Sequence, residues 1–213
     1  DNYYRNLITF LPRIFFIKSK KIDLAIHRNS SNKFRNLIIH LCNQMKIEVK
    51  LIFLDDGFYK FNNSQIPEFL NENISFKILN RLQNHKIKKS NKIYIRRNNC
   101  SFRNLINEED IFDSLKKIGF IAVDLSNYNI FEQIDLFSSA EVVVGPTGSG
   151  LSNIVFCKKG TKIFEISPKY NFIYENSFKL RFKNICDTLS LDYNFIEADS
   201  IDVIKKEKKF TKI

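Results

Sequence analysis

The stretch VVVGPTGSGLSNIVF, residues 142–156, decides the fold. Three valines predict a short buried strand, residues 145–150 a turn, and Ser149–Phe156 a helix. A strand that runs through a glycine-rich turn into a helix is the repeating unit of a parallel α/β sheet. Glycines let a ligand approach the backbone, and the free N–H groups of a helix start attract phosphate. A plain structural turn stays open as the alternative, because many strand-to-helix turns use Gly and Ser.

Strands and helices alternate along the whole chain. Strands are expected at residues 21–26, 49–54, 75–79, 92–96, 120–125, 142–145 and 162–166, and helices at 3–17, 33–45, 108–118, 130–140, 149–156 and 173–189. This spacing predicts α/β architecture with parallel, doubly wound sheets. Polar residues 80–91 are the candidate linker, so we divide the chain into lobes of residues 1–88 and 89–213, the first small or truncated.

Composition places the chain among globular proteins: 44% of its 213 residues are hydrophobic. Its apolar runs are too short for a spanning helix, and it has no signal-peptide pattern. The start at Asp1 leaves room for a missing upstream segment. Four cysteines without a CxxC pair predict reduced, buried thiols in a cytoplasmic protein, and neither a disulfide framework nor a zinc site.

The formal charge of +11 has three interpretations. Nucleic-acid binding and contact with an anionic membrane surface are two of them. The third is a general excess of lysine, with a few arginines gathered on a phosphate ligand. We rank the third first, because the lysines are dispersed and no nucleic-acid-binding motif is present. We therefore expect no nucleic-acid partner.

Three arginines also favour a phosphate ligand. Arg96, Arg97 and Arg103 fall within eight residues after an expected strand. The planar guanidinium suits diphosphate oxygens better than an ammonium group does. The glycine turn is expected at the same sheet edge, which favours one shared anionic ligand. A solvated basic loop is the alternative.

Residues 94–168 resemble the signature region of glycosyltransferase family 61. The family's pattern is filled by Arg97, Arg103, Asn107-Glu108, Gly119-Phe120, Glu132-Gln133, Phe137, Ala140, residues 145–151, Asn153, Glu165 and Pro168. The opening residues 2–13 also resemble the start of the family's domain.

The resemblance implies a GT-B-like fold of two Rossmann-like lobes, with the acceptor on the first and a nucleotide-sugar donor, expected to be UDP-linked, on the second. It implies inverting, metal-independent transfer to a glycan or lipid-linked acceptor in surface polysaccharide synthesis. No cofactor and no metal are expected, in keeping with the absence of an Asp-x-Asp motif. The expected localisation is the cytoplasm, and peripheral association with the inner face of the membrane is the alternative.

The resemblance also assigns the site residues. Arg97 and Arg103 would stabilise the leaving group, and the donor would contact Arg97, Arg103, Thr147, Gly148, Ser149, Gly150, Asn153 and Glu165. Glu165 could equally form a salt bridge at the sheet edge, and Glu132 and Gln133 could simply brace a helix. Asp55 and Asp56 are candidates for the base, with a plain turn as the alternative. The three histidines show no partner in the sequence.

Two residues depart from the family pattern. Thr147 stands where the loop usually has His, and Arg5 stands where a His often follows Tyr-Tyr. These departures keep a second hypothesis open: a non-catalytic protein of the same fold that binds a nucleotide sugar or a polyanion.

Overall fold

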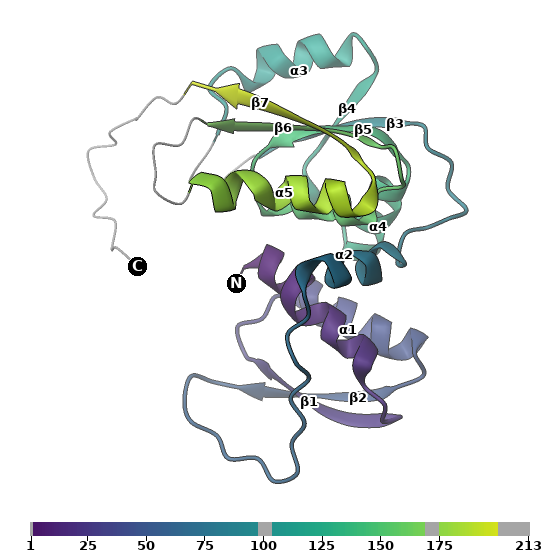
Figure 1. Ribbon diagram of the computed structural model, residues 1–213, viewed down its shortest axis with the longest axis vertical. Coiled ribbons are helices and arrows are strands. Elements are labelled where there is room, and N and C mark those ends of the chain that lie inside the picture. The colour runs from purple at the N-terminus through teal and green to yellow at the C-terminus, as the bar shows by residue number, and fades with distance from the viewer. Residues whose placement is uncertain (1, 98–103, 169–174, 200–213) are drawn as a thin grey trace, which may run out of the picture.

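The computed structural model describes residues 2–97, 104–168 and 175–199 and contains two parallel sheets (Figure 1). In the first lobe β1 (Lys21–His27) pairs with β2 (Glu48–Leu54). In the second lobe the strand order is β4-β3-β5-β6-β7. Its strands are β3 (Asn91–Ile95), β4 (Phe120–Val123), β5 (Ala140–Pro146), β6 (Lys162–Pro168) and β7 (Asp192–Ala198), every neighbouring pair parallel. The predicted α/β fold with parallel sheets is confirmed.

The first lobe packs its helices on one face of the two-stranded sheet. The chain starts with η1 (Arg5–Phe10, a π-helix) and η2 (Leu11–Phe16, a 3-10 helix), and Pro12 lies in the first turn of η2, where its missing N–H costs nothing. Helix α1 (Asn32–Gln44) begins at Ser31, whose hydroxyl accepts from the Phe34 N–H. Helix α2 (Glu72–Asn80) follows a long connection from β2.

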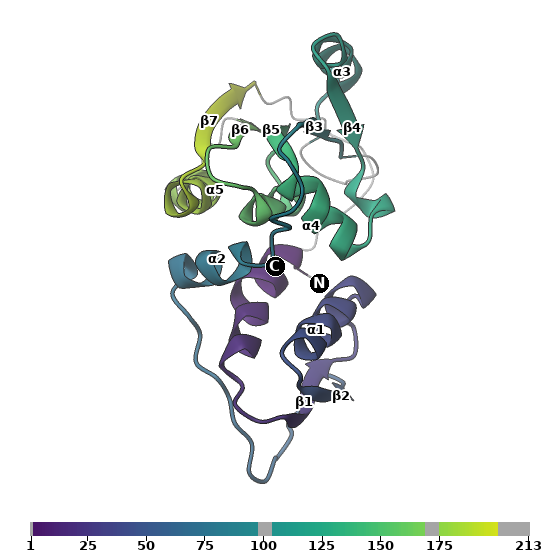
Figure 2. The same cartoon turned by 90° about the vertical axis from the view of Figure 1, so that its right-hand side faces the viewer.

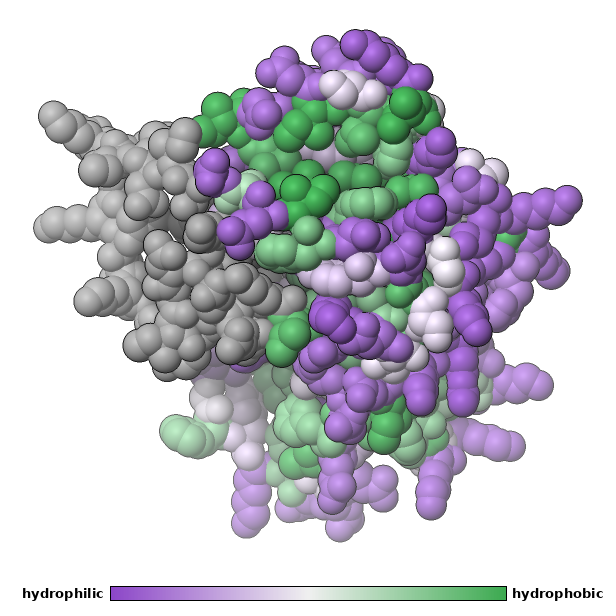
Figure 3. All heavy atoms as spheres, turned by 45° about the horizontal axis from the view of Figure 1, so that its top comes forward, coloured by the Kyte–Doolittle hydropathy of each residue, from purple (hydrophilic) through white to green (hydrophobic). Residues whose placement is uncertain are grey.

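The second lobe covers its sheet unevenly. Helices α4 (Ile130–Ser138), η4 (Ser149–Phe156, a 3-10 helix) and α5 (Glu175–Leu189) lie on the face toward the first lobe (Figures 1 and 2). The other face carries only α3 (Glu108–Lys116) among the described helices, over the β3 and β4 side (Figure 2). Figure 3 shows hydrophobic side chains gathered beside that helix.

One hydrophobic core runs through both lobes. Leu7, Leu41 and Phe76 of the first lobe belong to the same buried cluster as Val155 and Ile185 of the second. Helix α2 contacts both α5 and η4. The boundary proposed near residue 88 therefore crosses a shared core, and the division into lobes stays a prediction.

Three local predictions are wrong. Residues 75–79 form part of helix α2 and not a strand, because Phe76 and Leu79 repeat at helical spacing behind an Asn71 cap. Strand β7 was not expected at all. β2 is only partly buried, because the far face of the two-stranded sheet is open to solvent.

Three cysteines can be placed. Cys42, Cys157 and Cys186 are free and buried, and burial raises the pKa of each thiol. That is the predicted state, and Cys100 lies outside the described residues. In the part of the chain that the structure describes, no helix is both long enough and apolar enough to cross a bilayer.

Candidate functional site

The loops after β3 and β5 meet where the strand order of the second sheet reverses. From β3 the chain moves outward to β4, then returns past β3 to β5 and continues through β6 to β7. Ligands of open α/β sheets bind beyond the strand ends at such a switch point. Arg97 follows β3 and the glycine loop follows β5, so both lie at this position.

Arg97 lies across the glycine loop. Its Nη1 donates to the Thr147 carbonyl oxygen at 3.1 Å. A Cβ at position 148 would come 1.7 Å from the same nitrogen. The backbone of Gly148 is extended, so the position requires glycine for space and not for conformation. The loop and the guanidinium therefore form one unit.

Arg96 points the other way, as alternation along a strand requires. Its Nη2 lies 2.6 Å from the Glu109 Oε2, and its guanidinium stacks 4.8 Å from the centre of the Phe112 ring. It fixes α3 on the outer face. Arg103 lies outside the described residues, so its predicted role stays a prediction.

Neighbouring strands and helices hold the loop in place. The Thr147 N–H donates to the Ile166 carbonyl of β6 at 2.7 Å. Thr147 and Gly148 are buried, whereas Ser149 is exposed at the first position of η4. An added Cβ at Gly150 would come 3.0 Å from Leu125 Cδ1, so this glycine allows close packing beneath the loop. A ligand can reach the loop at the exposed Ser149 and the half-buried Gly150.

Asn153 is fully buried, and both the oxygen and the nitrogen of its side-chain amide are hydrogen-bonded to protein groups. Its Oδ1 accepts from the Tyr3 hydroxyl at 2.6 Å. Its Nδ2 donates to Gln133 Oε1 at 3.1 Å and to the Gly150 carbonyl at 3.0 Å. This geometry makes Asn153 a brace for the loop, and its predicted contact with the donor stays untested.

Gln133 and Glu132 also have structural partners. The Gln133 Nε2 donates to the carbonyls of Leu125 and Tyr128 at 2.9 and 3.0 Å. Glu132 completes a capping box with Asn129 at the start of α4, the Asn129 N–H donating to its Oε2 at 2.6 Å. Both contacts agree with the bracing alternative.

Glu165 lies in the middle of β6 and not at its end, because the strand continues to Pro168. It is 1% exposed, and its Oε2 accepts from the Tyr193 hydroxyl at 2.7 Å. Burial, then this hydrogen bond, raises the pKa of Tyr193, which keeps the phenol as the donor. The prediction of a strand-end residue is wrong, while a ribose contact stays untested.

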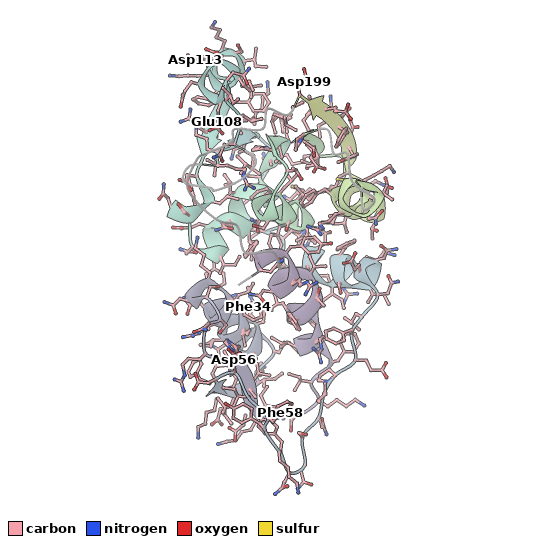
Figure 4. The ribbon with its side chains drawn as sticks, turned by 90° about the vertical axis from the view of Figure 1, so that its left-hand side faces the viewer. Phe34, Asp56, Phe58, Glu108, Asp113 and Asp199 are labelled. Atoms are coloured by element: carbon pink, nitrogen blue, oxygen red, sulfur yellow. The ribbon has the colours of Figure 1, made fainter. Side chains whose placement is uncertain are left out.

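Asp55 and Asp56 follow β2, in the first lobe. Arg28 Nε lies 2.7 Å from Asp55 Oδ1, and this hydrogen bond lowers the pKa of that carboxyl. Asp56 Oδ1 lies 3.0 Å from His27 Nε2. Figure 4 shows Asp56 on the far side of Phe34 as seen from the second lobe. The structure thus pairs both carboxylates within the first lobe and does not bring them beside Arg97.

The partners of His27 could not be found from sequence alone. The Asn29 N–H donates to its Nδ1 at 3.1 Å, so the neutral ring carries its proton on Nε2 and donates it to Asp56. Tyr3 and Lys33 were missed for the same reason: both reach the second lobe over long sequence separations. The Lys33 ammonium donates to the Leu125 carbonyl at 2.9 Å.

Comparison with known families identifies the family of the chain. The model of the family described as Glycosyltransferase 61 matches residues 3–164. The chain belongs to glycosyltransferase family 61. No curated protein matches it. Family 61 membership makes the chain a glycosyltransferase, and therefore an enzyme that takes a donor and an acceptor. The matched region includes Arg97 and the glycine loop but ends one residue before Glu165.

Proposed function

We propose that this family 61 enzyme transfers a sugar from a nucleotide-diphosphate donor, a UDP-sugar, to a glycan or lipid-linked acceptor in surface polysaccharide synthesis. The observation that carries the donor site is Arg97 lying across Gly148 at the switch point of the sheet. The proposed place is the cytoplasm, at the inner face of the membrane. Both lobes take part, the first on the acceptor side.

The proposed reaction inverts the anomeric carbon. The acceptor hydroxyl attacks that carbon, the bond from the carbon to the diphosphate oxygen breaks, and the leaving diphosphate takes the electron pair. Arg97 and the N–H groups that open η4 would neutralise the developing charge. Since these groups supply positive charge themselves, we propose that transfer needs no metal, and that activity survives treatment with a chelator such as EDTA.

A base must take the proton of the acceptor hydroxyl. Between the two candidates, Asp56 is favoured, because the Arg28 hydrogen bond lowers the pKa of Asp55 and makes that carboxylate a weaker base. The Asp56 side chain is 99% exposed, although the structure does not bring it beside Arg97, so its role as the base is tested by substitution. Asp56→Asn is expected to abolish transfer and leave UDP affinity unchanged; retained transfer would remove Asp56 from the mechanism.

Titration calorimetry with UDP, GDP and CDP tests the donor site. Arg97→Ala is expected to weaken UDP binding about 10- to 100-fold, because it removes a charge-assisted hydrogen bond that contributes about 1.5–3 kcal/mol. Arg96→Gln is the matched control, since it alters the neighbouring residue on the opposite face. Equal losses of UDP affinity in both variants would contradict the site. If none of the three nucleoside diphosphates binds, the proposed donor class is contradicted.

The second hypothesis, binding without catalysis, rests on Thr147, which is buried in the loop where the family usually has His. Incubation with UDP-sugars and release of UDP separates the two. Tight UDP binding with neither transfer nor hydrolysis of any donor would favour the non-catalytic protein.

A further inference from the structure

The connection between β2 and α2 is the longest irregular segment within the described residues. It spans residues 55–71 without a helix or strand. A connection of this length inside a compact protein is uncommon and usually functional. It lies at the end of the first lobe that is farthest from the second lobe (Figure 1), and Figure 4 shows Phe58 there.

Large apolar side chains are exposed along this segment. The exposed fractions are 108% for Phe58, 81% for Ile66, 64% for Phe69, 49% for Tyr59 and 46% for Phe61. Single exposed apolar residues are ordinary, but five on one segment mark an interaction surface. We call these five residues the apolar loop surface.

Contacts near both ends of the segment fix its position on the first lobe. The Tyr59 hydroxyl bonds the N–H and the carbonyl of Asp55, both at 3.1 Å. Near the other end, the Arg13 guanidinium lies 4.4 Å from the centre of the Phe69 ring and donates to the Pro67 carbonyl. Phe10 packs edge-on against Phe69. The segment is therefore anchored at both ends, while Phe58 and Ile66 project between the anchors.

The lobe that carries this surface is basic. Residues 1–88 contain 15 Lys and Arg against 7 Asp and Glu, a net +8 of the total +11. Lys60 lies between the exposed aromatic residues. At the base of the segment the Asp55 carboxylate is paired with Arg28, which limits its repulsion of anions. Exposed aromatic and aliphatic groups on a basic surface match the apolar and charged zones of an anionic bilayer.

We propose that the apolar loop surface docks the enzyme on a membrane that contains anionic lipids. Phe58 and Ile66 enter the headgroup zone, and basic side chains of the lobe meet the lipid phosphates. Insertion is shallow, because an irregular backbone cannot enter hydrocarbon without losing its hydrogen bonds to water. The inference rests on the proposed function, since it names the surface that brings the enzyme to a lipid-linked acceptor.

A lipid surface fits better than a free glycan. Sugar sites combine apolar groups with a few converging polar groups that fix orientation. Here the most exposed members are Phe58 and Ile66, an aromatic and an aliphatic residue. The surface also lies at the far end of the first lobe from the second lobe, which carries Arg97 and the glycine loop (Figure 1).

The absence of tryptophan from the chain gives a direct test. Phe58→Trp places the only tryptophan of the chain on the apolar loop surface, where it can be excited selectively. Its emission is expected to shift to shorter wavelength with vesicles of phosphatidylcholine and phosphatidylglycerol, and brominated lipids are expected to quench it. Ile106→Trp is the matched control, since Ile106 is 75% exposed in the second lobe. An unshifted Phe58→Trp spectrum, or an equal shift in the control, overturns the proposal.

Vesicle flotation tests the surface without a fluorophore. Phe58→Ser with Ile66→Ser is expected to lower the bound fraction at least about tenfold, and salt is expected to weaken wild-type binding. Ile106→Ser with Ile118→Ser removes exposed apolar groups from the second lobe, 75% and 60% exposed, and should leave the bound fraction unchanged. Unchanged flotation of the loop variant overturns the proposal. So does loss of transfer to a soluble acceptor without vesicles, which would make the loop a glycan site. UDP titration of the same samples separates these outcomes from failure of the donor site.

Discussion

Gly148 and Arg97 depend on one another. The loop can accept the guanidinium only because position 148 has no side chain, and the Thr147 carbonyl then fixes where the guanidinium lies. The backbone of Gly148 is extended and suits any residue. A methyl group at this position would therefore displace a flexible side-chain end and leave the fold intact.

Gly148→Ala is expected to weaken UDP binding about tenfold, with little change in melting temperature, because it moves Arg97 away from the loop. In the Arg97→Ala background the same substitution should leave UDP affinity almost unchanged. A double-mutant cycle by calorimetry measures this coupling. Additive losses would mean that position 148 acts on the ligand directly and not through Arg97.

Sequence reasoning reached part of this arrangement. Strand ends and the glycine turn predicted that Arg97 and the loop would share one sheet edge, and strand alternation could also have separated Arg97 from Arg96. The role of Asn153 as a brace was not predictable, because its partner Tyr3 lies 150 residues away in sequence. Such contacts arise only when the lobes pack together.

At the scale of elements, Asn153 of η4 joins α4 to Tyr3, which precedes η1. Burial raises the pKa of the Tyr3 phenol, so the neutral hydroxyl persists as a donor at any working pH. Tyr3→Phe leaves Asn153 Oδ1 without this donor and should lower the free energy of unfolding by about 1–2 kcal/mol. It should also weaken UDP binding, because Asn153 holds the Gly150 carbonyl.

Tyr4→Phe is the control for that prediction. It makes the same change one residue away, where the hydroxyl makes a longer bond of 3.4 Å to Glu72. Urea unfolding and UDP calorimetry on both variants give the comparison. If Tyr4→Phe weakens UDP binding as much as Tyr3→Phe does, the effect does not travel through Asn153.

The capping box of α4 is expected to serve stability alone. Asn129→Ala removes the side chain that accepts from Phe131 N and Glu132 N, and should lower the free energy of unfolding by about 1 kcal/mol. UDP affinity should stay unchanged. A clear loss of affinity in calorimetry would instead give Glu132, the family-pattern residue in this box, a role in the donor site.

Element prediction succeeded for α3, where apolar periodicity agreed with a C-terminal glycine, Gly119 in the left-handed region, although the Asn107 side chain makes no capping hydrogen bond. It failed for residues 75–79, where a short run of alternating character hid the helical spacing of Phe76 and Leu79. It also missed β7, an edge strand that begins directly after Ser190 and Leu191. Short segments depend on tertiary packing, which local sequence does not carry.

At the scale of the whole molecule, the two lobes share one hydrophobic core. Asn80 at the end of α2 donates to the carbonyls of Val155 and Cys157 at 2.8 and 2.9 Å, which satisfies the end of η4. η1 and α2 complete the cluster that buries η4 and α5. The glycine loop, the proposed donor site, is thus supported from both lobes.

The second lobe is therefore not expected to fold alone. A fragment of residues 89–213 would lose the Asn80 bonds and expose apolar groups that η1 and α2 now cover, such as Val155 and Phe156. It should aggregate or show no cooperative thermal transition by circular dichroism, and mixing it with a fragment of residues 1–88 should restore part of the transition. A fragment that melts cooperatively at the temperature of the full chain would show that the core is divided at residue 88, and that the donor lobe needs no support from the first.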